Sequence, residues 1–170
     1  HQHAVGAVGV VVDELRDPRP FMEALKAMLK GNPEWTNQLV IEFIGSINTT
    51  FRLFIAEDPV LSQVTRFRDP LPHQELVKLY GETDMQLLVL AHTTLAPGNL
   101  PGKFFEYLAS GNFIFGIGPE AGDASDILKR TGAGQMVDRS NTEGLLQLLQ
   151  SRFTRWQEGK LEAGRDVIMF

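Results

Sequence analysis

The chain has 170 residues, of which 43% are hydrophobic and 22% charged, proportions that fit a globular domain and exclude disordered, collagenous and coiled-coil chains. Its 16 Lys and Arg against 21 Asp and Glu give a net charge of -5, so no overall positive field exists to hold a nucleic-acid backbone. The sequence contains no cysteine, which excludes disulfides, thiolate nucleophiles and cysteine-ligated zinc.

The two ends of the chain indicate a piece of a larger protein. His1 precedes an apolar run at 4–12 without the basic segment or cleavage site of a signal peptide. Residues 167–170 are apolar and follow a charged stretch, as if more protein continued from them. We therefore expect residues 1–170 to be a single domain excised from a two-domain protein.

Short apolar runs alternate with segments of helical spacing along the chain. Nearly continuous runs predict strands that are covered on both faces, at residues 8–12, 39–44, 86–91 and 113–117. Shorter runs at 64–67 and 135–137 predict two more strands, each short enough to lie at an edge of the sheet.

Helix signals occupy the intervals between these runs. Asp17 and Pro18 precede a segment whose apolar residues share one face, and the turn at 31–33 ends it. Further along the chain, Pro72 opens a short helix that ends at Gly81.

Two more helices are indicated, and together the elements define a fold. Residues 48–56 favour a helix apart from two threonines, and Ser140 and Glu143 have capping-box spacing before an amphipathic segment. About six strands in alternation with helices predict a doubly wound α/β domain with a parallel sheet, which binds ligands at the carboxyl ends of its strands. The loops expected at these ends are 13–17, 45–48, 68–73, 92–101 and 118–123.

The loop after the fourth predicted strand carries the strongest chemical signal. Gly98 and Gly102 allow a ligand to approach the backbone, and a helix that starts near Pro101 offers free N–H groups to a diphosphate. Lys103 places a cation where the helix dipole favours an anion, at a cost of about 0.3–1 kcal/mol that a negatively charged ligand would reverse. Glu106, one turn later, is placed to accept hydrogen bonds from a ribose diol.

A plainer interpretation explains the same helix equally well. Lys103 and Glu106 then form a solvent-exposed pair worth about 0.2–0.5 kcal/mol, and the aromatic residues around them belong to the core. In either case Ser110 extends the two charged residues to a polar stripe on one face.

The stretch PGKFFEYLASG at 101–111, followed by the strand at 113–116, resembles the donor-site motif of GT-B glycosyltransferases of the group 1 (family 4) type. Earlier segments fit in the family's order, so the resemblance extends over about residues 5–149. These segments are 8–18, 64–67, 71–80 and 84–90.

The resemblance implies a Rossmann-like domain, the C-terminal half of a GT-B fold, that binds a nucleotide-diphosphate sugar such as a UDP- or GDP-sugar. Glu106 matches the glutamate that holds the ribose, Lys103 lies near the phosphates, and Arg16 approximates the basic residue that neutralises the diphosphate. No catalytic residue is assigned, and no metal is required if Arg16, Lys103 and the helix start carry the phosphate charge. The predicted donor-binding residues are Arg16, Gly98, Asn99, Leu100, Gly102, Lys103 and Glu106.

Two positions depart from the family's pattern. Gly98 stands eight residues before Glu106, where many members have the first glutamate of an E-x7-E pair. Val10 replaces an arginine that often follows the glycine of the first strand. These departures leave the sugar, the stereochemical outcome and the activity of the donor site open.

Three alternatives stay open beside the donor domain: a dinucleotide-binding module of the NAD type, a non-catalytic interaction module, and half of a sugar-nucleotide epimerase. Residues 116–122, with Asp138 about 20 residues after the first glycine, are similar to a dinucleotide fingerprint. Their spacing is GxGxxxG and Pro119 removes a donor N–H, so turns explain these glycines better. The sequence offers no metal-binding spacing among its histidines, His1, His3, His73 and His92.

For the whole protein, the resemblance implies a glycosyltransferase whose acceptor is bound by a missing N-terminal domain. The acidic charge balance argues against a nucleic-acid partner. The chain alone is then expected to bind nucleotide and to catalyse nothing, because acceptor groups lie across the interdomain cleft. A cytoplasmic location is expected, with peripheral association at the inner face of the membrane left open.

Overall fold

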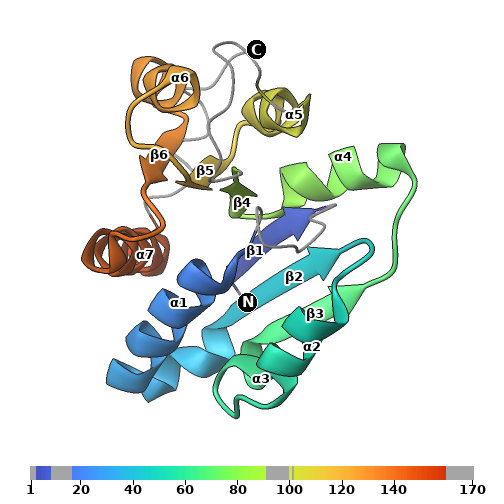
Figure 1. Ribbon diagram of the computed structural model, residues 1–170, viewed down its shortest axis with the longest axis vertical. Coiled ribbons are helices and arrows are strands. Elements are labelled where there is room, and N and C mark those ends of the chain that lie inside the picture. Colours follow the sequence, from blue (N-terminus) through green and yellow to red (C-terminus); the bar gives the residue numbers. More distant parts are fainter. Residues whose placement is uncertain (1–2, 9–16, 91–99, 101, 160–170) are drawn as a thin grey trace.

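The structure, a computed structural model, describes residues 3–8, 17–90, 100 and 102–159. Its strands all run parallel in one sheet, in the order β3-β2-β1-β4-β5-β6 (Figure 1). The predicted α/β fold with a parallel sheet is confirmed, and the two weakest predicted strands, β3 and β6, are its edges. The strands are β1 (His3–Val8), β2 (Leu39–Ile44), β3 (Thr65–Arg68), β4 (Met85–Val89), β5 (Phe113–Ile117) and β6 (Gly134–Val137).

The first strand lies earlier than the sequence predicted. β1 occupies His3–Val8, so its predicted start at Val8 is wrong, and residues 9–12 lie outside the described part of the chain. The apolar run at 4–12 fits a strand in more than one window. Pairing with β2 from His3 with Leu39 to Val8 with Ile44 fixes the register, which local hydrophobicity does not contain.

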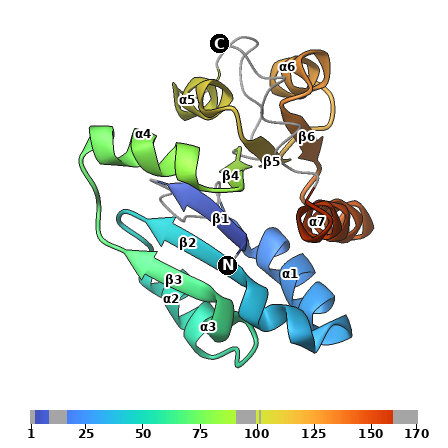
Figure 2. The same cartoon turned by 180° about the vertical axis from the view of Figure 1, so that it is seen from behind.

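Helices cover the sheet on both faces (Figures 1 and 2). One cluster of buried side chains joins the sheet to α1, α2, α3 and α7, and a second cluster joins it to α4, α5 and α6. The strand order reverses between β1 and β4, where the chain crosses from one face to the other, and ligands of doubly wound folds bind at this switch point. The helices are α1 (Arg19–Gly31), the 3-10 helix η1 (Pro33–Gln38), α2 (Thr49–Ala56), α3 (Leu61–Val64), α4 (His73–Glu82), α5 (Gly102–Ser110), α6 (Asp123–Thr131) and α7 (Thr142–Gln157).

Two asparagine caps explain where helices begin. The Asn48 side chain accepts hydrogen bonds from the N–H groups of Thr50 at 2.7 Å and Phe51 at 3.3 Å, which stabilises α2 despite its threonines. At α7 the cap is Asn141, which accepts from the Gly144 N–H at 3.0 Å. The predicted capping box at Ser140 is therefore wrong by one residue.

The physical reason is that Ser140 has another partner. Its hydroxyl donates to the Asp138 carboxylate at 2.6 Å, and its N–H donates to the same carboxylate oxygen at 2.9 Å. These bonds hold Ser140 in the turn after β6, so the next residue caps the helix.

Candidate functional site

The helix that follows each parallel strand begins at the carboxyl edge of the sheet, so the starts of α1, α4 and α5 lie on one side of the molecule. The predicted helix start near Pro101 is confirmed, since α5 begins at Gly102. Phe104 and Tyr107 are fully buried against the sheet, and Lys103 and Glu106 are half-buried between that core and solvent. The sequence therefore placed both charged residues correctly on the helix.

Glu106 has a partner that the sequence did not indicate. The Nε2 atom of His73, the first residue of α4, lies 2.9 Å from the Glu106 Oε2 atom, and the Glu106 side chain is 35% exposed. His73 belongs to the 68–73 loop that the sequence marked for its position at the carboxyl edge. The sequence indicated His73 only through its position after a predicted strand. Its contact with Glu106 depends on how α4 packs beside α5.

Three buried polar residues and the half-buried Ser110 link α4 to α5; we call Thr83, Gln86, Ser110 and Asn112 the α4–α5 polar network. The Tyr80 carbonyl oxygen accepts from the Thr83 hydroxyl at 3.1 Å, from the Gln86 amide at 2.8 Å and from the Asn112 amide. Ser110 donates to the Gln86 Oε1 atom at 3.1 Å and to the Tyr107 carbonyl at 2.6 Å. The predicted polar stripe is thus corrected, because Ser110 hydrogen bonds toward the interior.

The ring of Tyr80 adds an apolar contact to this junction. It meets the Tyr107 ring edge to face, with the centroids 5.1 Å apart. Burial, and secondarily the negative charge of Glu106, raises the pKa of Tyr80 to about 12. The Tyr80 phenol is therefore neutral at physiological pH.

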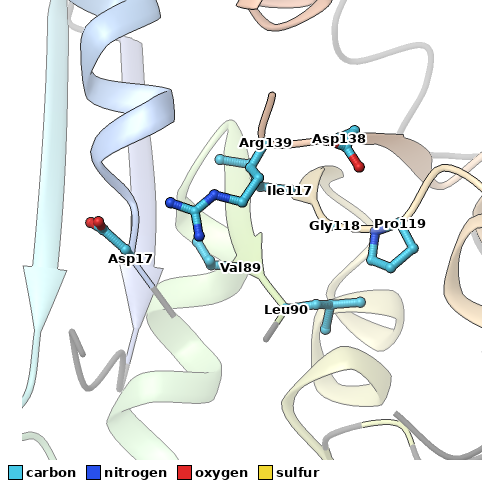
Figure 3. Close-up of a pocket in the computed structure, with 8 residues that line it drawn as sticks. All are labelled: Asp17, Val89, Leu90, Ile117, Gly118, Pro119, Asp138 and Arg139. Carbon is cyan, nitrogen blue, oxygen red and sulfur yellow. The ribbon is translucent and has the colours of Figure 1, made fainter. Parts of the chain in front are cut away.

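A pocket opens at the carboxyl ends of β4, β5 and β6, next to the start of α1 (Figure 3). Figure 3 shows the Arg139 guanidinium reaching toward the Asp17 side of the pocket, with Asp138 beside Pro119. The Asp17 carboxylate accepts from the Arg19 N–H at 3.0 Å and is buried. The lining residues are Asp17, Val89, Leu90, Ile117, Gly118, Pro119, Asp138 and Arg139.

The turn after β6 belongs to this edge, but the sequence analysis did not include it among the loops expected to face a ligand. Asp138 and Arg139 directly follow a strand, so the rule that marked the other loops would have found them. Glu120 ties this turn to the preceding one by accepting from the Asp138 N–H at 2.9 Å and the Asn141 amide at 3.1 Å. These hydrogen bonds lower the pKa of Glu120, with the Asp138 N–H as the largest cause.

The remaining predicted site residues fall into two groups. Arg16, Gly98 and Asn99 lie outside the described residues. Leu100 packs against the cluster of α4, α5 and α6, and the exposed Gly102 begins α5.

The dinucleotide-like glycines have a packing explanation. A Cβ at Gly116 would lie 2.8 Å from the Met136 Sδ atom, and one at Gly118 would lie 3.1 Å from the Leu90 Cβ atom. Gly122 has φ of 134°, in the region that favours glycine, and caps the start of α6. Close contact with Leu90 and a positive φ therefore account for Gly118 and Gly122, whereas Gly116 lies within β5, where a turn does not explain it and the nearest atom belongs to the flexible Met136 side chain.

Two further properties concern the described residues alone. Within these ranges no three His, Asp or Glu side chains are grouped so that they could hold a metal ion. None of the helices described is long and apolar enough to cross a membrane.

Comparisons with known proteins establish the fold. No protein-family model and no curated protein matches the chain. Among solved structures it is similar to WaaG, a glycosyltransferase involved in lipopolysaccharide biosynthesis, with a TM-score of 0.73 and 14% identity over 99% of this chain and 42% of WaaG. The predicted resemblance to a GT-B glycosyltransferase C-terminal domain is supported at the level of the fold.

Two other similar structures were determined with ligands. An E. coli trehalose-6-phosphate structure bound with UDP-2-fluoro glucose has a TM-score of 0.68 and 10% identity over 98% of this chain and 40% of its own. The pneumococcal O-GlcNAc transferase GtfA in complex with UDP and GlcNAc has a TM-score of 0.65 and 18% identity over 96% of this chain and 30% of GtfA. The chain thus spans 30% to 42% of the length of these three proteins.

Proposed function

We propose that this chain is the nucleotide-diphosphate-sugar binding domain of a glycosyltransferase whose acceptor-binding half lies outside it. The observation that carries the proposal is the first two turns of α5, where half-buried Lys103 and Glu106 lie at the carboxyl edge of a GT-B-like sheet. A cation and a carboxylate one turn apart match a diphosphate next to a ribose. The two similar structures that hold UDP or a UDP-sugar support this ligand class.

The chemistry of sugar transfer gives each residue a role in this proposal. As the glycosidic bond of the donor breaks, the departing nucleoside diphosphate gains negative charge, which Lys103, Arg16 and the N–H groups at the start of α5 would stabilise. Glu106 would bind the ribose hydroxyls and hold the nucleotide in place. With the phosphate charge carried in this way, no metal ion is needed. The loop residues Gly98, Asn99, Leu100 and Gly102 would let the donor approach the backbone.

The pocket of Figure 3 lies at the same carboxyl edge of the sheet, at the ends of β4, β5 and β6 and next to the start of α1. Its polar rim, with Asp17 and Arg139, and its apolar floor, with Val89 and Ile117, suit a group rich in hydroxyls. We propose that the part of the donor beyond the nucleotide binds in this pocket. The acceptor would come from the absent half, in a cytoplasmic protein that binds the inner membrane face peripherally or not at all.

Calorimetric titration of the chain with UDP, GDP, ADP and NAD tests the proposal. We expect saturable binding of one nucleoside diphosphate, weakened at least tenfold by Glu106→Ala and by Lys103→Ala, because each variant loses a charged contact. The control variants are Glu34→Ala and Lys30→Ala. Both residues are exposed and lie near the end of α1 and the start of β2, at the opposite edge of the sheet.

Binding that survives both site variants unchanged would contradict the proposed site. Binding of NAD alone would move the function to a dinucleotide-binding module. Thermal unfolding of each variant separates loss of a contact from loss of the fold.

A further inference from the structure

The contact between His73 and Glu106 joins two helices inside the proposed ribose site. His73 begins α4 after β3, and Glu106 lies in the second turn of α5 after β4, so both approach the carboxyl edge. The 2.9 Å between Nε2 and Oε2 is hydrogen-bond distance. A ribose bound to Glu106 would therefore lie beside the imidazole.

The two helices that carry this pair are joined by buried hydrogen bonds and a ring contact. The Tyr80 carbonyl binds three donors from β4 and from the two helix ends, and the Tyr80 and Tyr107 rings are in contact. Gln86 and Asn112, which supply two of those donors, are 0% exposed. Buried contacts near the other end of the helices thus join the two elements that carry His73 and Glu106.

The contact with His73 leaves hydrogen-bonding capacity on the Glu106 carboxylate. A carboxylate offers about four acceptor positions, and the imidazole occupies one of them on the Glu106 Oε2 atom. The Oε1 atom and the remaining positions can still receive the two hydroxyls of a cis-diol. The His73 side chain is 67% exposed, so a nucleotide can reach it.

A purely structural interpretation treats the pair as a surface link between α4 and α5. Exposed pairs of this kind contribute little to stability, and the α4–α5 polar network already joins the helices. Orienting the Glu106 carboxylate would affect ligand affinity more than stability, because a preorganised group loses less freedom when the ligand binds.

We infer that His73 is a positioning residue that orients the Glu106 carboxylate toward the 2′ and 3′ hydroxyls, and so makes the site select ribonucleotides over 2′-deoxyribonucleotides. This inference rests on the proposed function, since it concerns the ribose of the same nucleoside diphosphate.

The test is a titration of the chain with UDP and GDP and with their 2′-deoxy forms. We expect the wild-type chain to prefer the ribose form of the diphosphate that it binds by roughly tenfold, the value of one hydrogen bond to a charged group. His73→Ala should reduce this preference severalfold, because the ribose form then loses the oriented contact to both hydroxyls whereas the deoxy form loses only that to its 3′ hydroxyl. His73→Gln keeps an N–H donor and should restore part of the preference.

Gln74→Ala is the matched control, because Gln74 is the exposed neighbour of His73 on the same helix turn. It should keep the wild-type preference. An undiminished ribose preference in His73→Ala, with a nucleoside diphosphate still bound, would overturn the inference and leave the proposed function standing. Failure of the wild-type chain to bind any nucleoside diphosphate would contradict the proposed function, and this inference with it.

Discussion

Gly134 is a residue whose missing side chain lets two strands meet. It opens β6 and pairs with Ile114 of β5. A Cβ at this position would lie 2.1 Å from the Ile114 carbonyl oxygen, a backbone atom that cannot move away without disturbing the sheet. Gly81 in α4 is the opposite case, because a Cβ there would have no atom within 4 Å.

Alanine at these two positions should therefore have opposite effects. We expect Gly134→Ala to lower the free energy of unfolding by about 1–3 kcal/mol, since the strands must shift to admit the methyl group. Gly81→Ala should raise it by about 0.5–1 kcal/mol, because alanine loses less backbone entropy in a helix. Urea unfolding measures both, and equal effects of the two substitutions would show that close approach at Gly134 is not the cause.

Single residues of the candidate site were predictable to different degrees. Lys103 and Glu106 could be found because a charged pair in the first turns of a helix after a glycine-rich loop is a local pattern. His73 and Arg139 could not be assigned roles, because their neighbours at the site come from other segments of the chain. Proximity of this kind depends on how strands are ordered in the sheet.

At the scale of elements, the junction of α4, β4 and α5 depends on buried polar groups. Gln86 is fully buried in a strand whose neighbours are apolar, and its amide donates to the Tyr80 carbonyl and, at 2.5 Å, to the Thr83 hydroxyl. Its Oε1 atom accepts from Ser110. One side chain thus joins two helix ends to the middle of the sheet.

Gln86→Leu has a similar volume and removes all three hydrogen bonds. We expect it to lower the free energy of unfolding by about 1–3 kcal/mol, because the Ser110 and Thr83 hydroxyls each lose a buried partner. The exposed Gln147 of α7 provides the control, and Gln147→Leu should change stability by less than about 0.5 kcal/mol. Equal midpoints of urea unfolding for the two variants would contradict a stabilising role of the network.

Across the whole molecule, α7 returns the chain from the β6 edge to α1 at the middle of the sheet. Phe153 of α7 is buried, with its ring 4.6 Å from that of Trp35 and 5.6 Å from that of Trp156. Both tryptophans of the sequence therefore lie at this contact. Their fluorescence reports on one junction, whereas circular dichroism reports on all helices and strands.

Phe153→Ala tests whether this junction and the sheet unfold together. We expect a loss of about 3–5 kcal/mol, from the buried ring and the cavity left behind, with coincident midpoints by fluorescence and circular dichroism. Leu53→Ala on α2 removes a side chain that is 53% exposed and should have little effect. Separate transitions by the two probes would show that α7 unfolds independently of the rest.

The sequence by itself determined the alternation of strands and helices, the weak strands at the edges, the start of α5 and two charged residues of the candidate site. These features depend on hydrophobic periodicity and helix-end chemistry, which act between residues close in the chain. Only the tertiary structure decided the register of β1, the hydrogen bond from Ser110 to Gln86 and the pairing of His73 with Glu106. Each of these requires a choice among several locally acceptable partners, and packing between distant segments makes that choice.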